Sequence, residues 1–140
     1  MREILFRGKR KNGTEWVYGN YCGAEYLSSS GIEHLIIEIP RNGCSAQVDP
    51  ETIGQYTGLT ANGKKIFEGD IVKREFTLYH SEKKKTRETQ IGVVTYSDTD
   101  CGFYLEKACN LRKPWDGDTL EVIGNIHDNP ELLKGGETDV

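Results

Sequence analysis

The sequence predicts an all-β protein, and three features carry that prediction. An Asn-Gly pair stands between short runs of β-forming residues twice, at Asn12-Gly13 and at Asn62-Gly63. Asn-Gly is the strongest short hairpin signal, because both residues tolerate the positive φ of a type I′ turn. Clusters of turn residues such as 113–118 separate the runs, and 120–126 alternates like a half-buried strand.

The first half of the chain, residues 1–50, is expected to be an N-terminal antiparallel β-sheet unit. Strands at 4–6 and 16–18 flank the Asn12-Gly13 turn, and a third strand at 34–39 is too continuously apolar to face solvent. Pro40 closes that strand, since proline has no N–H to donate to a neighbouring strand. Asp49-Pro50 starts a turn or a single helical turn, which marks the boundary between the halves.

The second half, residues 51–134, is expected to form further strands joined by turns. A hairpin turns at Asn62-Gly63, and residues 78–89 form a polar, basic hairpin loop or insertion. Pro130 suits the first position of a short terminal helical turn, and 135–140 is expected to be a disordered tail. The strands expected in this half are 70–76, 90–96, 102–105 and 120–126.

A short pattern occurs twice in the chain. Residues 12–21 and 62–71 share Asn-Gly, two apolar residues four positions on, and then Gly followed by Asn or Asp. Each copy reads as a hairpin turn and a glycine where the chain bends into another strand. A duplicated β-unit and chance recurrence of a common hairpin signature account for the pattern about equally well.

Composition places the chain among ordinary soluble proteins, with 36% hydrophobic and 29% charged residues over 140 positions. No apolar run approaches the roughly 18 to 20 residues of a membrane span, and the charged N-terminus does not resemble a signal peptide. We therefore expect a cytoplasmic protein with no membrane partner.

The four cysteines form no Cys-x-x-Cys pair, so free thiols are favoured, although an even count permits disulfides. A zinc site would need Cys101 and Cys109 to recruit one of the histidines, at positions 34, 80 and 127. Nothing in the pattern indicates a metal or another cofactor, and none is expected.

Catalytic chemistry has few candidates. Glu68 and Asp70 flank a glycine at a bend, where Asp is more often a turn residue bonded to nearby backbone than an acid or base. Asp98 and Asp100 read as a turn, because the spacing of an EF-hand calcium loop is not met. No nucleophile elbow, phosphate loop or zinc-protease segment is present. We expect no catalytic residues and no enzyme.

Charge is unevenly distributed along the chain. The whole chain has a net charge of −4, whereas 73–87 holds six basic and two acidic residues, a local charge of about +4. Basic side chains with aromatic neighbours follow a phosphate backbone and stack on bases in nucleic-acid-binding proteins. A solvated loop whose lysines prevent aggregation is the competing interpretation, and the overall acidity favours it. The candidate nucleic-acid-binding residues are Lys73, Arg74, Tyr79, Lys83, Lys84, Lys85 and Arg87.

Aromatic residues offer a second kind of surface. The chain has two tryptophans and seven tyrosines, most of them expected in the core or in cross-strand pairs. Trp115, in a Pro-Trp-Asp-Gly turn, is expected to be part-exposed and to belong to a partner or oligomer interface.

One stretch also resembles a known family. The order Gly54-Gln55-Tyr56-Thr57-Gly58-Leu59, Asn62-Gly63-Lys64 and Ile66-Phe67-Glu68-Gly69-Asp70-Ile71-Val72 is similar to the signature of the YopX family, small proteins of bacteriophages and prophages. The resemblance continues at 6–9, 92–94 and 120–133. It implies an all-β domain whose second half is similar to an SH3-like barrel packed on the N-terminal unit. It implies the cytoplasm of a bacterial host cell as the location, and it implies no reaction.

The leading expectation is thus a phage or prophage accessory protein that binds a protein partner or assembles with itself. Nucleic-acid binding through the basic segment is the alternative, and a small hydrolase or metal-dependent enzyme ranks far behind both.

Overall fold

A computed structural model describes residues 2–25, 32–38, 45–105 and 119–133. The described residues form ten strands and a short 3-10 helix in two antiparallel sheets, so the all-β prediction is confirmed. Trp115 and residues 135–140 lie outside the described residues.

The larger sheet has six strands in the order β4-β3-β2-β1-β5-β6. Neighbours along the chain pair as hairpins, while β1 takes β5 on its other side through Phe6↔Gln55 and Arg7↔Gly54. The 3-10 turn η1 (Pro50–Thr52) leads into β5, and Asp49 caps it by accepting from the Glu51 N–H. The strands are β1 (Phe6–Lys9), β2 (Trp16–Glu25), β3 (Ile32–Ile37), β4 (Ser45–Gln47), β5 (Gly54–Ala61) and β6 (Lys64–Phe67).

The smaller sheet has four strands in the order β10-β7-β8-β9. Its centre is the pair β7 (Asp70–Tyr79) and β8 (Lys85–Ser97), with β9 (Gly102–Leu105) beside β8 and β10 (Thr119–Asn125) beside β7. The β10–β7 register shifts between Val122 and Gly124, as at a β-bulge. A helical turn at 131–133 follows β10, as the sequence predicts.

The chain divides into two compact units, Met1–Gly58 and Leu59–Val140. Strand β5 belongs to both, because its first residues pair with β1 and its end turns into β6. The closure that a barrel requires is not seen among the described residues: β5 and β6 are hydrogen-bonded into the larger sheet, and β7 to β10 form a separate sheet.

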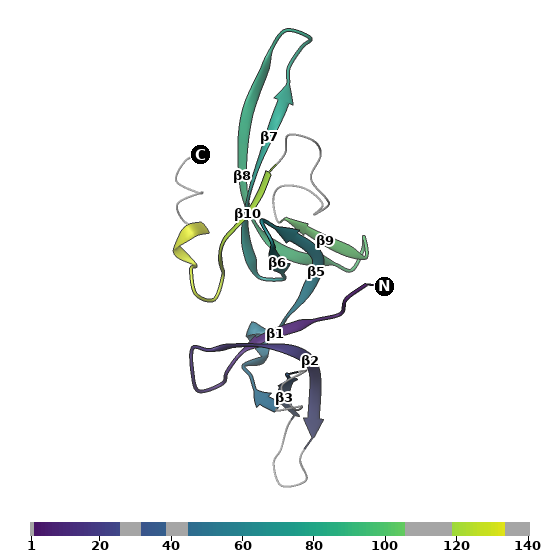
Figure 1. The fold of residues 1–140 in the computed structure, drawn as a ribbon, viewed down its shortest axis with the longest axis vertical. Helices are drawn as coiled ribbons and strands as arrows, with labels where there is room; N and C mark the ends of the chain where they lie inside the picture. The colour runs from purple at the N-terminus through teal and green to yellow at the C-terminus, as the bar shows by residue number, and fades with distance from the viewer. Residues whose placement is uncertain (1, 26–31, 39–44, 106–118, 134–140) are drawn as a thin grey trace. The chain divides into compact units, whose positions relative to one another are not determined.

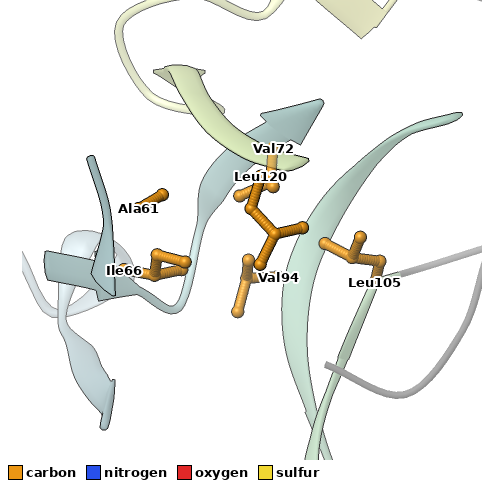
Figure 2. Packing of buried hydrophobic residues seen from close by; sticks show 6 residues of the cluster. All are labelled: Ala61, Ile66, Val72, Val94, Leu105 and Leu120. Carbon is orange, nitrogen blue, oxygen red and sulfur yellow. The ribbon is translucent and has the colours of Figure 1, made fainter. Parts of the chain in front are cut away.

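Each unit has its own apolar core. In the first, Val17, Ile36, Ala46 and Val48 are buried together, with Phe6 and Ile53 packed against them. In the second, side chains from β5, β6, β7, β8, β9 and β10 meet (Figure 2). This cluster consists of Ala61, Ile66, Val72, Val94, Leu105 and Leu120. The hairpin β5–β6 is therefore held to the smaller sheet by packing.

The two Asn-Gly pairs adopt different turns. Asn62 (φ 52°) and Gly63 (φ 78°) both have positive φ, as the predicted hairpin turn requires. Asn12 and Gly13 do not have positive φ, and the Gly13 N–H donates to the Arg10 carbonyl at 3.2 Å. The type I′ turn expected at Asn12-Gly13 is therefore wrong, because a longer loop joins β1 and β2.

The repeated pattern also folds in two ways. Gly69 has φ 88° and separates β6 from β7, whereas Gly19 lies inside the continuous strand β2. A Cβ at Gly19 would collide with the Ile37 carbonyl oxygen on β3, so close backbone approach explains that glycine. The two copies therefore do not form the same β-unit.

The loop expected at 78–89 is also wrong in extent. Strands β7 and β8 pair continuously to Tyr79↔Lys85, so only residues 80–84 form the connection. The basic segment is a β-hairpin.

Candidate nucleic-acid interface

The β7–β8 hairpin extends past both neighbouring strands of its sheet (Figure 1). In the described part of the chain, the pairing of β10 with β7 ends at Glu75. The pairing of β9 with β8 begins at Val94, so β9 leaves the earlier residues of β8 uncovered. Residues 76–88 therefore form a two-stranded arm, called here the ribbon. At about 3.3 Å per residue, Tyr79 lies roughly 13 Å beyond Glu75 along the strand.

A tight turn closes the ribbon. The Lys84 N–H donates to the Ser81 carbonyl at 3.3 Å and to Ser81 Oγ at 3.1 Å. The His80 N–H donates to the Lys84 carbonyl at 2.9 Å. Every side chain from 78 to 85 is exposed. The turn thus places Glu82 and Lys83 at the outermost point of the hairpin, with Lys84 closing the turn against Ser81.

The strand register sorts the ribbon's side chains onto two faces, because opposed residues of an antiparallel pair share a face. The Tyr79 face consists of Glu75, Thr77 and Tyr79 from β7 with Lys85, Arg87 and Thr89 from β8. The Leu78 face consists of Arg74, Phe76 and Leu78 with Thr86, Glu88 and Gln90.

On the Tyr79 face, Glu75 is the one acidic residue. Its carboxylate lies 3.4 Å from Lys73 Nζ and 4.0 Å from Arg87 Nη2, and Arg87 Nη1 donates to Thr77 Oγ1 at 3.2 Å. These are exposed ion pairs, worth about 0–1 kcal/mol each, so a competing phosphate can replace them. Among the described residues, no carboxylate lies within ion-pairing distance of the ammonium groups of Lys83, Lys84 and Lys85.

On the Leu78 face, polar groups bind one another. Thr86 Oγ1 donates to Glu88 Oε1 at 2.8 Å and lies 2.9 Å from His80 Nε2. Since the hydroxyl has a single proton, His80 Nε2 is the donor in the second bond. Nearer the base, the Arg74 guanidinium lies over the Phe76 ring at 4.5 Å and donates to Gln90 at 3.4 Å. The polar and charged side chains on this face therefore contact one another along the hairpin.

Tyr79 is 73% exposed, more than any other large hydrophobic side chain in the described residues. The adjacent Leu78, on the other face, is 43% exposed. An exposed ring at the tip of an arm is free to stack on a base or to insert into a partner.

The structure brings five of the seven candidate residues together at the outer end of the ribbon: Tyr79, Lys83, Lys84, Lys85 and Arg87. Lys73 lies at the base, and Arg74 points to the Leu78 face, where it contacts Phe76. Sequence reasoning missed Glu75 and Thr77, which share a face with Arg87. Their alternation with Tyr79 indicates a shared face only once β7 is known to continue to Tyr79.

The carboxylates considered for catalysis have structural positions. Asp70 is 2% exposed, and its Oδ2 accepts from the Phe67 N–H at 2.8 Å. Asp98 and Asp100 lie in the turn between β8 and β9, where the Asp100 N–H donates to Ser97 Oγ at 3.1 Å. Both turn interpretations are confirmed.

Within the described residues, no three His, Cys, Asp or Glu side chains are grouped closely enough to hold a metal ion. Cys22 and Cys101 are free and exposed, while Cys44 and Cys109 lie outside the described residues. None of the helical segments described has the length and apolar character of a membrane span.

One exposed pair was not anticipated. The Tyr21 hydroxyl lies 2.6 Å from His34 Nδ1, and the two rings stack with centroids 5.8 Å apart. The pair follows from the β2–β3 register, which the sequence does not provide. The His127 backbone N–H donates to Asn125 Oδ1 at 3.0 Å, in the turn that follows β10.

Fold and surface together describe a small all-β protein with a projecting basic hairpin. A family model described as YopX protein matches residues 5–134. The chain belongs to the YopX family, and the predicted family resemblance is confirmed. No curated protein and no solved structure matched the chain.

Proposed function

We propose that this YopX-family chain is a non-enzymatic binding protein that contacts nucleic acid through the ribbon. The observation that carries the proposal is the tip itself, where Lys83, Lys84 and Lys85 have no carboxylate partner in the described part of the chain and lie beside a 73% exposed Tyr79. Unpaired cations release counterions when they meet phosphates, and this supplies most of the affinity of non-specific nucleic-acid binding.

The overall acidity does not oppose this proposal as strongly as the sequence suggests. The net charge is −4, and a local charge of about +4 on 73–87 leaves about −8 on the remainder. At physiological ionic strength the Debye length is about 8 Å. The tip stands roughly 13 Å beyond the last pairing of β10 with β7, at about 3.3 Å per residue. Acidic groups at the base of the sheet are therefore largely screened at the lysines.

A second proposal, binding of a protein partner or self-assembly, is favoured by a different observation. Tyr96 is 45% exposed on β8 and forms an edge-to-face pair with Phe103 on β9, with ring centroids 5.3 Å apart. Tyrosine and phenylalanine at an exposed sheet surface are typical interface anchors. An accessory role in a phage or prophage, which the family resemblance implies, is part of both proposals. The SH3-like arrangement of the second half, which the resemblance also implies, is proposed with them.

Charge reversal on the ribbon tests the first proposal. The variant Lys83→Glu/Lys85→Glu is compared with Lys11→Glu/Lys64→Glu, which changes the net charge equally at exposed lysines in other parts of the chain. Binding is measured by fluorescence anisotropy with labelled single-stranded and duplex oligonucleotides at about 50 mM salt, where phosphate contacts are strong.

The wild type and the control variant are expected to bind at least one of the two probes, and the ribbon variant is expected to lose binding. Binding that both variants lose equally would assign the effect to net charge and overturn the proposal. Absence of wild-type binding to either probe would also overturn it. If the wild type is instead a concentration-dependent oligomer by sedimentation and binds neither probe, the second proposal replaces the first.

A further inference from the structure

The outer end of the Tyr79 face combines an aromatic ring with two cations. Tyr79 and Lys85 are directly opposed, and Arg87 follows Lys85 two residues along the same face. Opposed residues have Cβ atoms about 5 Å apart, and side chains two positions along a strand are separated by about 7 Å. Lys83 and Lys84 extend the positive charge into the turn, where the acidic Glu82 offsets one of the cations. A ring thus stands beside Lys85, within a short row of cations that runs from the turn to Arg87.

This combination suits a nucleic-acid strand whose bases are free to stack. Base–aromatic stacking needs an exposed base face, which a single strand offers and a regular duplex hides within its own stack. A two-stranded ribbon also fits the duplex major groove, about 12 Å wide, but that docking reads base edges and gives a stacking ring no special role. The 73% exposure of the ring therefore favours the single strand.

The Leu78 face is poorly suited to a phosphate chain. Its paired strand residues include no lysine, and they include the Glu88 carboxylate, which accepts from Thr86. Arg74 lies over Phe76 and donates to Gln90, so the cation on this face is engaged nearer the base. A strand lying here would meet a negative charge opposite Phe76.

Glu75 limits the path on the Tyr79 face. Its carboxylate lies between Lys73 and Arg87, at 3.4 and 4.0 Å. A phosphate moving from Arg87 toward the base meets this negative charge. The attractive part of the face therefore extends from the turn to Arg87.

We infer that the ribbon takes a single-stranded nucleic acid along its Tyr79 face, with one base stacked on Tyr79 and the backbone phosphates beside Lys83, Lys84, Lys85 and Arg87. This inference rests on the proposed function, and it adds the form of the nucleic acid and the face that binds it.

The test compares neighbouring residues on opposite faces. Tyr79→Ala removes the ring, Leu78→Ala is the matched truncation on the other face, and Tyr79→Phe keeps a ring without the hydroxyl. Affinities are measured for an oligothymidylate of about twelve nucleotides, a length within the site sizes of known single-strand binders, and for a duplex of the same length. Thermal melts of each variant show whether the fold is kept.

Tyr79→Ala is expected to weaken single-strand binding about 5- to 150-fold, the range of one lost stacking contact. Leu78→Ala and Tyr79→Phe should stay within about twofold of wild type, and the duplex should bind more weakly and respond little to Tyr79→Ala.

Other outcomes separate this inference from the proposed function. A duplex bound at least as tightly as the single strand, with no effect of Tyr79→Ala but a loss in Lys83→Glu/Lys85→Glu, overturns the inference and leaves the proposed function standing. Equal losses in Leu78→Ala and Tyr79→Ala overturn the assignment of the face. If the wild type binds neither probe, this inference and the proposed nucleic-acid-binding function fail together.

Discussion

Replacing Asp70 with alanine removes a buried acceptor from the corner where β6 ends and β7 begins. Asp70 Oδ2 accepts from the Phe67 N–H at 2.8 Å, and the side chain is 2% exposed. Gly69 between them has φ 88°; its N–H donates to the Val94 carbonyl, and its own carbonyl accepts from the Ile126 N–H, both at 2.9 Å. The corner therefore ties three segments of the second unit together.

The expected cost follows from the donor left behind. Phe67 is 3% exposed, so without the carboxylate its N–H remains buried without that acceptor. An unsatisfied buried donor costs about 1–3 kcal/mol, and bonds to charged groups lie toward the upper end. We expect Asp70→Ala to lower the free energy of unfolding of the second unit by about 2–3 kcal/mol. Asp70→Asn keeps an acceptor oxygen in place and should cost less.

Urea denaturation of the wild type and both variants measures these changes, with the slope of each transition checked for constancy. A loss of less than about 0.5 kcal/mol in Asp70→Ala, the range of an ordinary surface substitution, would refute the structural role assigned to the corner. Asp70→Ala should keep the oligonucleotide affinity of the wild type while it is folded. Loss of binding by a folded variant would show instead that the corner belongs to the site.

Two further predictions concern a turn and an ion pair. Gly63→Ala should lower the free energy of unfolding by about 1–2 kcal/mol, because the backbone φ at Gly63 is 78°. Gly13→Ala should be nearly neutral, because the atom nearest to the added Cβ is 3.8 Å away. Equal urea midpoints for the two variants would contradict this prediction. Glu75→Gln should tighten single-strand binding about two- to fivefold, because it frees Lys73 and Arg87 from an exposed carboxylate; unchanged or weaker affinity by anisotropy would count against the proposed path.

Local signals in the sequence predicted several elements correctly. The Asn62-Gly63 turn, the Pro50 helical turn and the alternating strand at β10 each depend on residues close together in the chain. Such signals are sufficient because positive φ, a fixed proline φ and a period of two are properties of short segments.

What the sequence could not supply depends on distant partners. Gly19 resembles a bend until β3 is known to bring the Ile37 carbonyl against it. The sequence predicts a loop at 78–89 because neither face of the hairpin is buried there, so its strands show no apolar alternation, although Thr77, Tyr79, Thr86 and Thr89 are β-forming residues. The basic cluster was visible in the sequence. Its division into two faces was not, since it needs the Tyr79↔Lys85 register.

The salt dependence of single-strand binding tests the central claim most directly. Contacts from Lys83, Lys84, Lys85 and Arg87 to four phosphates give a slope of log K against log salt concentration of about −2.8, at about −0.7 for each contact. Affinity for the oligothymidylate should therefore fall about 50-fold between 50 and 200 mM salt, and Lys83→Glu/Lys85→Glu should flatten the slope. A slope near zero, or one that this variant leaves unchanged, would contradict the ribbon as a nucleic-acid-binding element.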